Sequence, residues 1–126
     1  MSLFLAAALL TQSAVMVTPP LTVPAPALPS GDVGFNEILA NRPLAAIKRI
    51  EASELARKGD PLAMINLGTA YKMVGRKDEA ARFYRTALRS DDRYDVQLAN
   101  GRWIDSRRAA ALAMSRLDSN EVLALR

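Results

Sequence analysis

The sequence predicts a mainly α-helical fold, in which a short stack of helical hairpins ends in a C-terminal β-hairpin and a capping helix. Three observations lead to this prediction. Apolar and small residues recur at intervals of three and four along 61–92, with glycines between the helical runs. Asn100-Gly101 lies between two alternating stretches, which is typical of a β-hairpin. The first charged residue is Asp32, so the preceding segment differs in character from the rest of the chain.

The uncharged N-terminal segment has the composition of a targeting sequence. Residues 3–10 form an apolar run that suits a secretory signal and is shorter than the roughly 20 residues of a membrane span. Prolines follow, and Ala25-Pro26-Ala27 offers small residues for cleavage. We therefore expect residues 1–27 to be a signal peptide and residues 28–34 a proline-rich linker. The alternatives are an uncleaved N-terminal anchor and a cytoplasmic leader. The expected location is the periplasm of a Gram-negative bacterium, or its inner membrane if the segment is an anchor.

The folding unit is expected to cover residues 35–117, and its first part has the pattern of two helices. Residues 35–40 suit a short helix. A longer helix is expected over 43–58, because Pro43 suits a first helical turn. The apolar contacts of this longer helix would be Leu44, Ile47, Ile50 and Leu55. Together these elements predict a repeat over 32–58 whose first helix is truncated.

The next helix has clear start and stop signals. In Gly59-Asp60-Pro61 the glycine can end one helix, the aspartate can cap the next, and the proline suits its first turn. We expect this helix over 62–74, with Gly75 ending it. Gly68 lowers its stability by about 1 kcal/mol relative to alanine, which is acceptable if a neighbouring helix approaches closely there. The apolar face would be Met64, Leu67, Ala70, Tyr71 and Val74.

A second helix follows, and the acidic pair Asp78-Glu79 suits the positive end of its dipole. Its buried stripe is expected to be Ala80, Phe83, Tyr84, Ala87 and Leu88. A basic row lies outside this stripe and consists of Arg76, Lys77, Arg82, Arg85 and Arg89. The row is either a solvated outer face or a surface for acidic lipid, nucleic acid or a polyanionic cell-wall polymer. No aromatic residues are interleaved for base stacking, so no nucleic-acid partner is expected.

The range 61–92 resembles a tetratricopeptide repeat (TPR). The matching residues are Ala63, Asn66, Leu67, Gly68, Ala70, Tyr71, Gly75, Asp78, Glu79, Ala80, Tyr84, Ala87, Leu88 and Asp91. Met64 stands where the family usually has a bulky aromatic residue, and Asp92 where it commonly has proline. The resemblance implies a helical hairpin that stacks on similar units and binds ligands on the inner face of its first helix. One hairpin cannot bury its own apolar face, so flanking elements are expected to complete the stack.

The stretch after the repeat is predicted to form a β-hairpin over 94–106, with a two-residue turn at Asn100-Gly101. A helix over the same stretch is the alternative. Val96 and Leu98 would share the inner face with Trp103 or Ile104. Trp103 is expected to anchor the hairpin to the core, and the alternative is an exposed recognition residue.

A final helix is predicted over 107–117 with Ser106 as its cap. It would cover the open end of the stack with Ala110, Leu112, Ala113, Met114 and Leu117. Residues 118–126 are predicted to be a tail.

The composition argues against catalysis. The chain has no cysteine and no histidine, which removes thiolate chemistry, disulfides and the commonest general base and metal ligand. No carboxylate spacing fits a calcium loop. We expect no catalytic residues, no cofactor and no metal. The net charge of +4 arises from a modest excess of Lys and Arg, which is typical of a solvated surface.

The expected function is a non-catalytic adaptor of the cell envelope that binds a peptide or partner protein. The resemblance implies that the inner face of the helix over 62–74 touches the ligand, through Leu62, Ile65, Thr69, Lys72 and Met73. The alternative is that these residues pack against the helix over 43–58. A second expectation is a self-assembling structural subunit that dimerises through its incomplete stack. Contact with a membrane is expected only if the N-terminal segment is not cleaved.

Overall fold

The computed structural model describes residues 33–126, so the predicted signal peptide and most of the predicted linker lie outside the described residues. The fold is mainly α-helical with a small antiparallel hairpin and a helix after it, as the sequence predicts. The elements in chain order are α1 (Phe35–Leu39), α2 (Pro43–Glu51), α3 (Glu54–Arg57), α4 (Pro61–Met73), α5 (Lys77–Arg89), β1 (Asp95–Gln97), β2 (Trp103–Asp105) and α6 (Ser106–Ser115).

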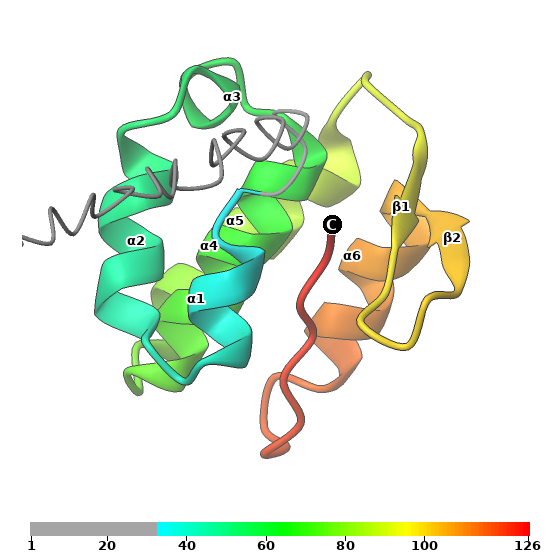
Figure 1. Cartoon of the computed structure of the whole chain (residues 1–126). Coiled ribbons are helices and arrows are strands. Elements are labelled where there is room, and N and C mark those ends of the chain that lie inside the picture. Colours follow the sequence, from blue (N-terminus) through cyan, green and yellow to red (C-terminus); the bar gives the residue numbers. More distant parts are fainter. Residues whose placement is uncertain (1–32) are drawn as a thin grey trace, which may run out of the picture.

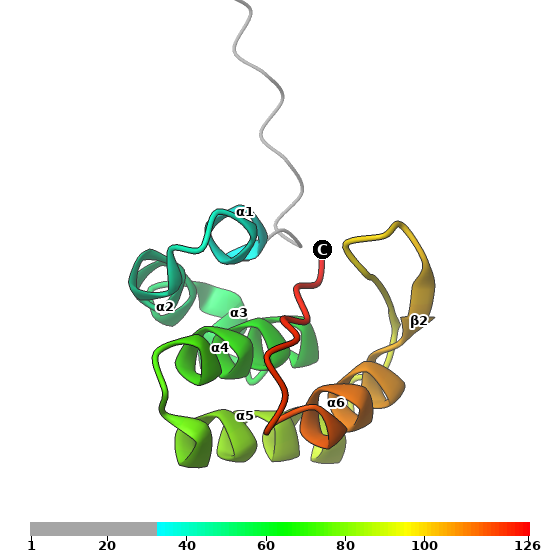
Figure 2. The ribbon, with the colours of Figure 1, turned by 90° about the horizontal axis from the view of Figure 1, so that it is seen from below.

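Helix α4 is the centre of the domain. It contacts α1, α2, α5 and α6, and Figures 1 and 2 show these helices arranged around it. Its start follows the expected signals, because Pro61 is in the first turn and the Asp60 carboxylate accepts a hydrogen bond from the Ala63 amide at 3.1 Å. Every residue from Pro61 to Ala70 is buried. A helix buried on all sides is a core helix rather than an amphipathic surface helix.

Helices α4 and α5 form the predicted hairpin. Gly75 has φ of 83°, the left-handed conformation expected after a helix. The two helices approach closely at Gly68, where an added Cβ would lie only 2.6 Å from Cε1 of Tyr84. Ala80 and Ala87 are fully buried as small contacts in the same interface. The prediction that Gly68 permits a close approach is therefore confirmed.

The single helix predicted over 43–58 is two helices in the structure. Helix α2 ends at Glu51, and Ser53 is extended, with φ of −79° and ψ of 149°. The Ser53 hydroxyl accepts a hydrogen bond from the Ala56 amide at 3.2 Å and caps α3. Serine side chains compete in this way with helix continuation. Leu44 was expected to be a core contact, but it faces solvent and is 73% exposed.

Strands β1 and β2 pair antiparallel, with Val96 opposite Ile104. The hairpin is confirmed, but the predicted two-residue turn is wrong. The Leu98 amide donates to the Arg102 carbonyl at 2.8 Å, so the loop consists of residues 99–101. Gly101 ends this loop with φ of 86°. A three-residue hairpin loop uses a left-handed residue at that position, which glycine adopts without strain.

Two details of the hairpin and α6 differ from expectation. Trp103 does not anchor the hairpin, because it is 63% exposed, and Ile104 packs against the core instead. The cap of α6 is Asp105 rather than Ser106. Its carboxylate accepts hydrogen bonds from the amides of Arg107 at 3.0 Å and Arg108 at 3.3 Å. Aspartate caps a helix as well as serine does, so the earlier residue can take the role.

The domain extends beyond the predicted range of 35–117 at both ends. Val33, assigned to the linker, is buried in the core. Residues 118–126, predicted to be a tail, return along α4 toward α1, as Figures 1 and 2 show. Ala124 and Leu125 of this stretch belong to the core cluster. We call residues 119–126 the C-terminal segment.

Candidate functional site

The predicted partner-binding residues lie on α4, but most of them are not at the surface. Leu62, Ile65 and Thr69 are 3%, 0% and 0% exposed. Lys72 and Met73 are half-buried. The interpretation of these five residues as an open surface is therefore wrong for this structure. Helix α2 covers part of α4, as the alternative interpretation held, and the C-terminal segment covers another part.

The C-terminal segment is held by three polar side chains spaced three residues apart on α4. The amide group of Asn66 bonds to the main chain of Leu125. One turn later, the Thr69 hydroxyl donates to the Leu123 carbonyl at 2.8 Å. These bonds progress in opposite directions along the two chains, so the segment runs antiparallel to α4.

Lys72 makes the third of these contacts. Its ammonium group donates to the carbonyl oxygens of Glu121 at 2.5 Å and Arg116 at 2.7 Å. Burial lowers the pKa of Lys72, because desolvation disfavours the charged form. The two carbonyl oxygens replace part of the lost hydration. Lys72 thereby fixes the turn that follows α6 as well as the start of the segment.

All three side chains form hydrogen bonds only with main-chain atoms of the segment. Asn66, Thr69 and Lys72 contact alternate residues, at positions 125, 123 and 121. A strand offers main-chain groups on one side at this two-residue interval. This face of α4 therefore holds an extended chain through its main chain, and we call the face formed by Asn66, Thr69 and Lys72 the α4 groove.

The opposite edge of the segment pairs with the hairpin. The amides and carbonyls of Gln97 and Arg126 exchange two hydrogen bonds of 2.9 Å, and Leu98 forms an antiparallel bridge with Leu125. The segment thus adds a short third strand beside β1. The Arg126 guanidinium lies 4.9 Å from the centre of the Phe35 ring on α1, a cation–π contact.

Thr69 also joins the groove to α5. Its hydroxyl lies 3.0 Å from the hydroxyl of Tyr84. Burial raises the pKa of Tyr84 to about 12. Tyr84 is therefore a neutral core residue that supports the groove from behind.

Two other tyrosines bond to carboxylates at the rim of the domain. The Tyr94 hydroxyl donates to both oxygens of Asp60 at 2.8 Å, and burial, followed by this bond, raises the pKa of Tyr94. The Tyr71 hydroxyl donates to Glu51 at 2.6 Å, and this bond raises the pKa of Tyr71. Both pairs connect neighbouring elements, so we assign them a structural role.

Asn66 is the groove residue that the sequence reasoning did not select as a binding residue. It was recognised only as a match to the repeat pattern. A signal was present, because Asn66 is a polar residue inside an otherwise apolar helix, between Ile65 and Leu67. A buried amide must satisfy its hydrogen bonds, so such a residue indicates a specific contact.

Within residues 33–126, no three side chains of the types His, Cys, Asp and Glu gather to hold a metal ion. None of the helices in this range is long and apolar enough to span a membrane. Comparison with known proteins gave no match to a family model, a curated protein or a solved structure.

Proposed function

We propose that the protein is a non-catalytic, TPR-like adaptor of the cell envelope that binds an extended segment of a partner protein. The observation that supports this proposal most is the set of main-chain hydrogen bonds in the α4 groove. Bonds of this kind do not depend on the side chains of the segment. Another extended chain can therefore make the same bonds, as in other modes of recognition that use the peptide backbone.

The C-terminal segment occupies the groove in cis, so a partner must replace it. The side chains of the C-terminal segment indicate which residues a competing segment must have. Leu125 and Ala124 are buried in the core cluster, and Leu125 pairs with Leu98, whereas Val122 is exposed. A competing segment therefore requires a small and a branched apolar residue next to each other. Selection by such pockets, added to main-chain bonds, is how extended peptides acquire specificity.

Site-specific photo-crosslinking in intact cells tests the groove directly. A photoreactive amino acid replaces Lys72, which contacts the segment, and as a matched control it replaces Ala111, which is exposed on α6. We expect position 72 to capture a partner protein that position 111 does not capture. If position 72 forms only an internal product with the C-terminal segment, the segment is a permanent part of the core and the proposal fails.

The location needs a separate test. Fractionation of cells followed by N-terminal sequencing of the mature protein determines whether the chain is exported and where it is cleaved. We expect a start within residues 14–28 in the periplasmic fraction. An intact N-terminus in the soluble cytoplasmic fraction would rule out the envelope location.

Self-assembly is the second candidate, and one observation favours it. Leu39 and Leu44, at the outer end of the stack, are 55% and 73% exposed. Two copies could bury these leucines against each other and so complete the stack. Sedimentation of the purified chain tests this, since Leu44→Gln should convert a dimer to a monomer. A chain that is monomeric throughout excludes the idea.

A further inference from the structure

The outer face of α5 carries three arginines that take part in no ion pair of the described residues. Six ion pairs occur in residues 33–126, and they include two members of the basic row, Arg76 with Glu79 and Lys77 with Asp118. Arg82, Arg85 and Arg89 take part in none of these pairs. All three are exposed. The basic row therefore consists of two sets. Arg76 and Lys77 are in ion pairs, whereas Arg82, Arg85 and Arg89 form the unpaired set.

The stability of α5 accounts for only part of the unpaired set, in which Arg82 makes a cation–π contact with Phe83 at 5.6 Å. Arg82 and Arg85 are three residues apart, and Arg85 and Arg89 are four apart, so each neighbouring pair places like charges side by side. Such like-charge pairs destabilise a helix. The helix dipole favours cations in the last turn only, which covers Arg89 alone. An external anion is a consistent explanation for the other two.

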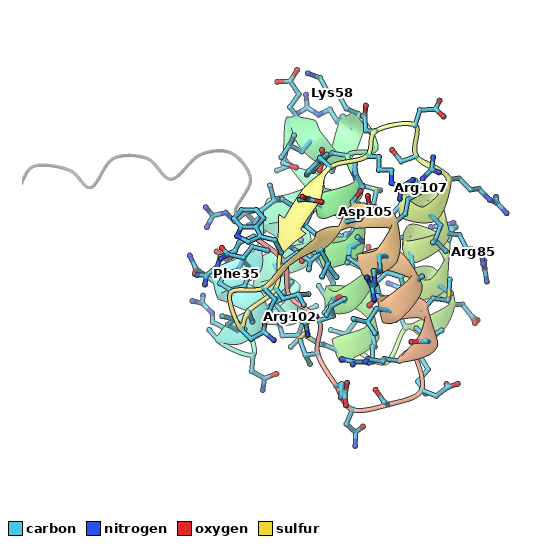
Figure 3. The ribbon with its side chains drawn as sticks, turned by 90° about the vertical axis from the view of Figure 1, so that its right-hand side faces the viewer. Phe35, Lys58, Arg85, Arg102, Asp105 and Arg107 are labelled. Atoms are coloured by element: carbon cyan, nitrogen blue, oxygen red, sulfur yellow. The ribbon has the colours of Figure 1, made fainter. Side chains whose placement is uncertain are left out.

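These arginines line a hollow of about 470 Å³ between α5 and the loop that joins α3 to α4. The lining residues are Lys58, Gly59, Arg82, Arg85, Thr86, Arg89, Ser90 and Asp91. Arg82 and Arg89 are seven residues apart on the helix, which corresponds to about 10 Å. Figure 3 shows Arg85 pointing away from the domain on the side opposite Phe35 of α1. The hollow and the α4 groove thus lie on different faces.

The shape and surroundings of the hollow favour one class of ligand. Cations spread over about 10 Å suit several negative charges on one chain better than a single phosphate. A membrane would need apolar side chains beside the charges, but the large exposed apolar residues of the described chain are Leu39, Leu44, Tyr94, Trp103 and Val122, and all are outside α5. Stacking on nucleic-acid bases would need exposed aromatic rings on α5, and Phe83 is half-buried there.

We propose that the hollow beside α5 binds an acidic segment of a partner protein, whose carboxylates pair with Arg82, Arg85 and Arg89. Guanidinium groups pair well with carboxylates through charge-assisted hydrogen bonds. Lys58 is on the opposite wall, where its pairing with Glu54 is exposed and exchangeable. This surface is separate from the α4 groove. The proposal for the hollow therefore does not depend on the function proposed for that groove.

Fluorescence anisotropy with a labelled oligoglutamate peptide tests the proposal on the full chain. We expect binding that weakens with salt and that falls about tenfold in the triple variant R82Q/R85Q/R89Q, since three exposed pairs of about 0.5 kcal/mol each amount to roughly the 1.4 kcal/mol of a tenfold change. The matched control is R42Q/R102Q/R108Q, which removes the same charge from exposed positions elsewhere. It should bind nearly as well as the original chain.

Three results would overturn the proposal. Equal weakening in both triple variants would mean that only net charge matters. The second result is tighter binding to vesicles containing phosphatidylglycerol than to oligoglutamate, and the third is tighter binding to a single-stranded oligonucleotide. If the R82Q/R85Q/R89Q variant lost that binding, the same arginines would be assigned to a membrane or to nucleic acid. Circular dichroism serves as the folding control. We expect the variant to melt close to the original chain, because removal of like-charge repulsion offsets the loss of the Arg89–dipole and Arg82–Phe83 interactions.

Discussion

The carboxamide of Asn66 and the main chain of Leu125 form a reciprocal pair of hydrogen bonds. Nδ2 of Asn66 donates to the Leu125 carbonyl at 2.8 Å, and Oδ1 accepts from the Leu125 amide at 2.9 Å. The same Nδ2 also donates to the Val33 carbonyl at 2.8 Å. One buried side chain at the centre of the domain therefore connects the first and the last parts of the described chain.

Replacing Asn66 by alanine should destabilise the domain strongly. The change leaves the Val33 carbonyl and both main-chain groups of Leu125 without their side-chain partner in a buried site. Each unsatisfied buried group costs about 1–3 kcal/mol, so we expect a total loss of at least about 3 kcal/mol. Urea unfolding measures it. Thr86→Ala, on the exposed face of α5, is the control and should change stability by less than about 0.5 kcal/mol. Equal effects of the two variants would contradict the role of Asn66.

Local signals in the sequence were sufficient for the helix ends and the hairpin. Asp60 and Gly75 are specified by neighbouring residues, because caps and left-handed turns depend on a few positions in a row. Gly101 located the hairpin for the same reason. The loop length was missed because it depends on how Leu98 pairs with Arg102, which the dipeptide alone does not determine.

The location of the C-terminal segment could not be predicted in this way. Leu123, Ala124 and Leu125 form too short a run to show a period, and the α4 residues that bond to Leu123 and Leu125 are more than fifty positions earlier. The burial of the predicted partner-binding residues, in contrast, could be predicted from the sequence. Leu62 and Ile65 face away from Met64 and Leu67, so α4 is apolar on both sides, which indicates a fully buried helix.

Replacing Gly68 by alanine should destabilise the domain, although alanine is the better helix former. Helix propensity alone would favour the change by about 1 kcal/mol. The new methyl group would, however, lie within 2.6–2.8 Å of the Tyr84 ring and 3.1 Å from the Ala80 carbonyl. Overpacking of this kind costs about 1–3 kcal/mol, so we expect a lower melting temperature. In a Tyr84→Leu background the same change should be less harmful, and an undiminished penalty there would show that the ring is not the obstacle.

Trp103 should report a solvent-exposed position. It is the single tryptophan of the chain and is 63% exposed, so its fluorescence should be quenched readily by acrylamide in the folded state and should shift little on unfolding. Trp103→Ser should change the free energy of unfolding by less than about 0.5 kcal/mol, as for other surface sites. A blue-shifted, protected emission would mean that the hairpin packs through this ring after all.

Tyr84 should make stability depend on alkaline pH. Its pKa is raised to about 12 in the folded domain, whereas an unfolded chain has a tyrosine pKa of about 10. The neutral form is thus favoured by folding, and its contribution is fully present below about pH 10 and is lost as the pH rises from 10 to about 12. The expected loss is about 2 kcal/mol.

The control is Tyr84→Phe, whose ring has no hydroxyl to ionise. Its stability should therefore fall less over this pH range than that of the original chain. Tyr71 and Tyr94 titrate in both proteins, and urea unfolding at a series of pH values isolates Tyr84 as the difference between the two curves. Parallel curves would show that the hydroxyl of Tyr84 ionises as readily in the folded chain as in the unfolded one.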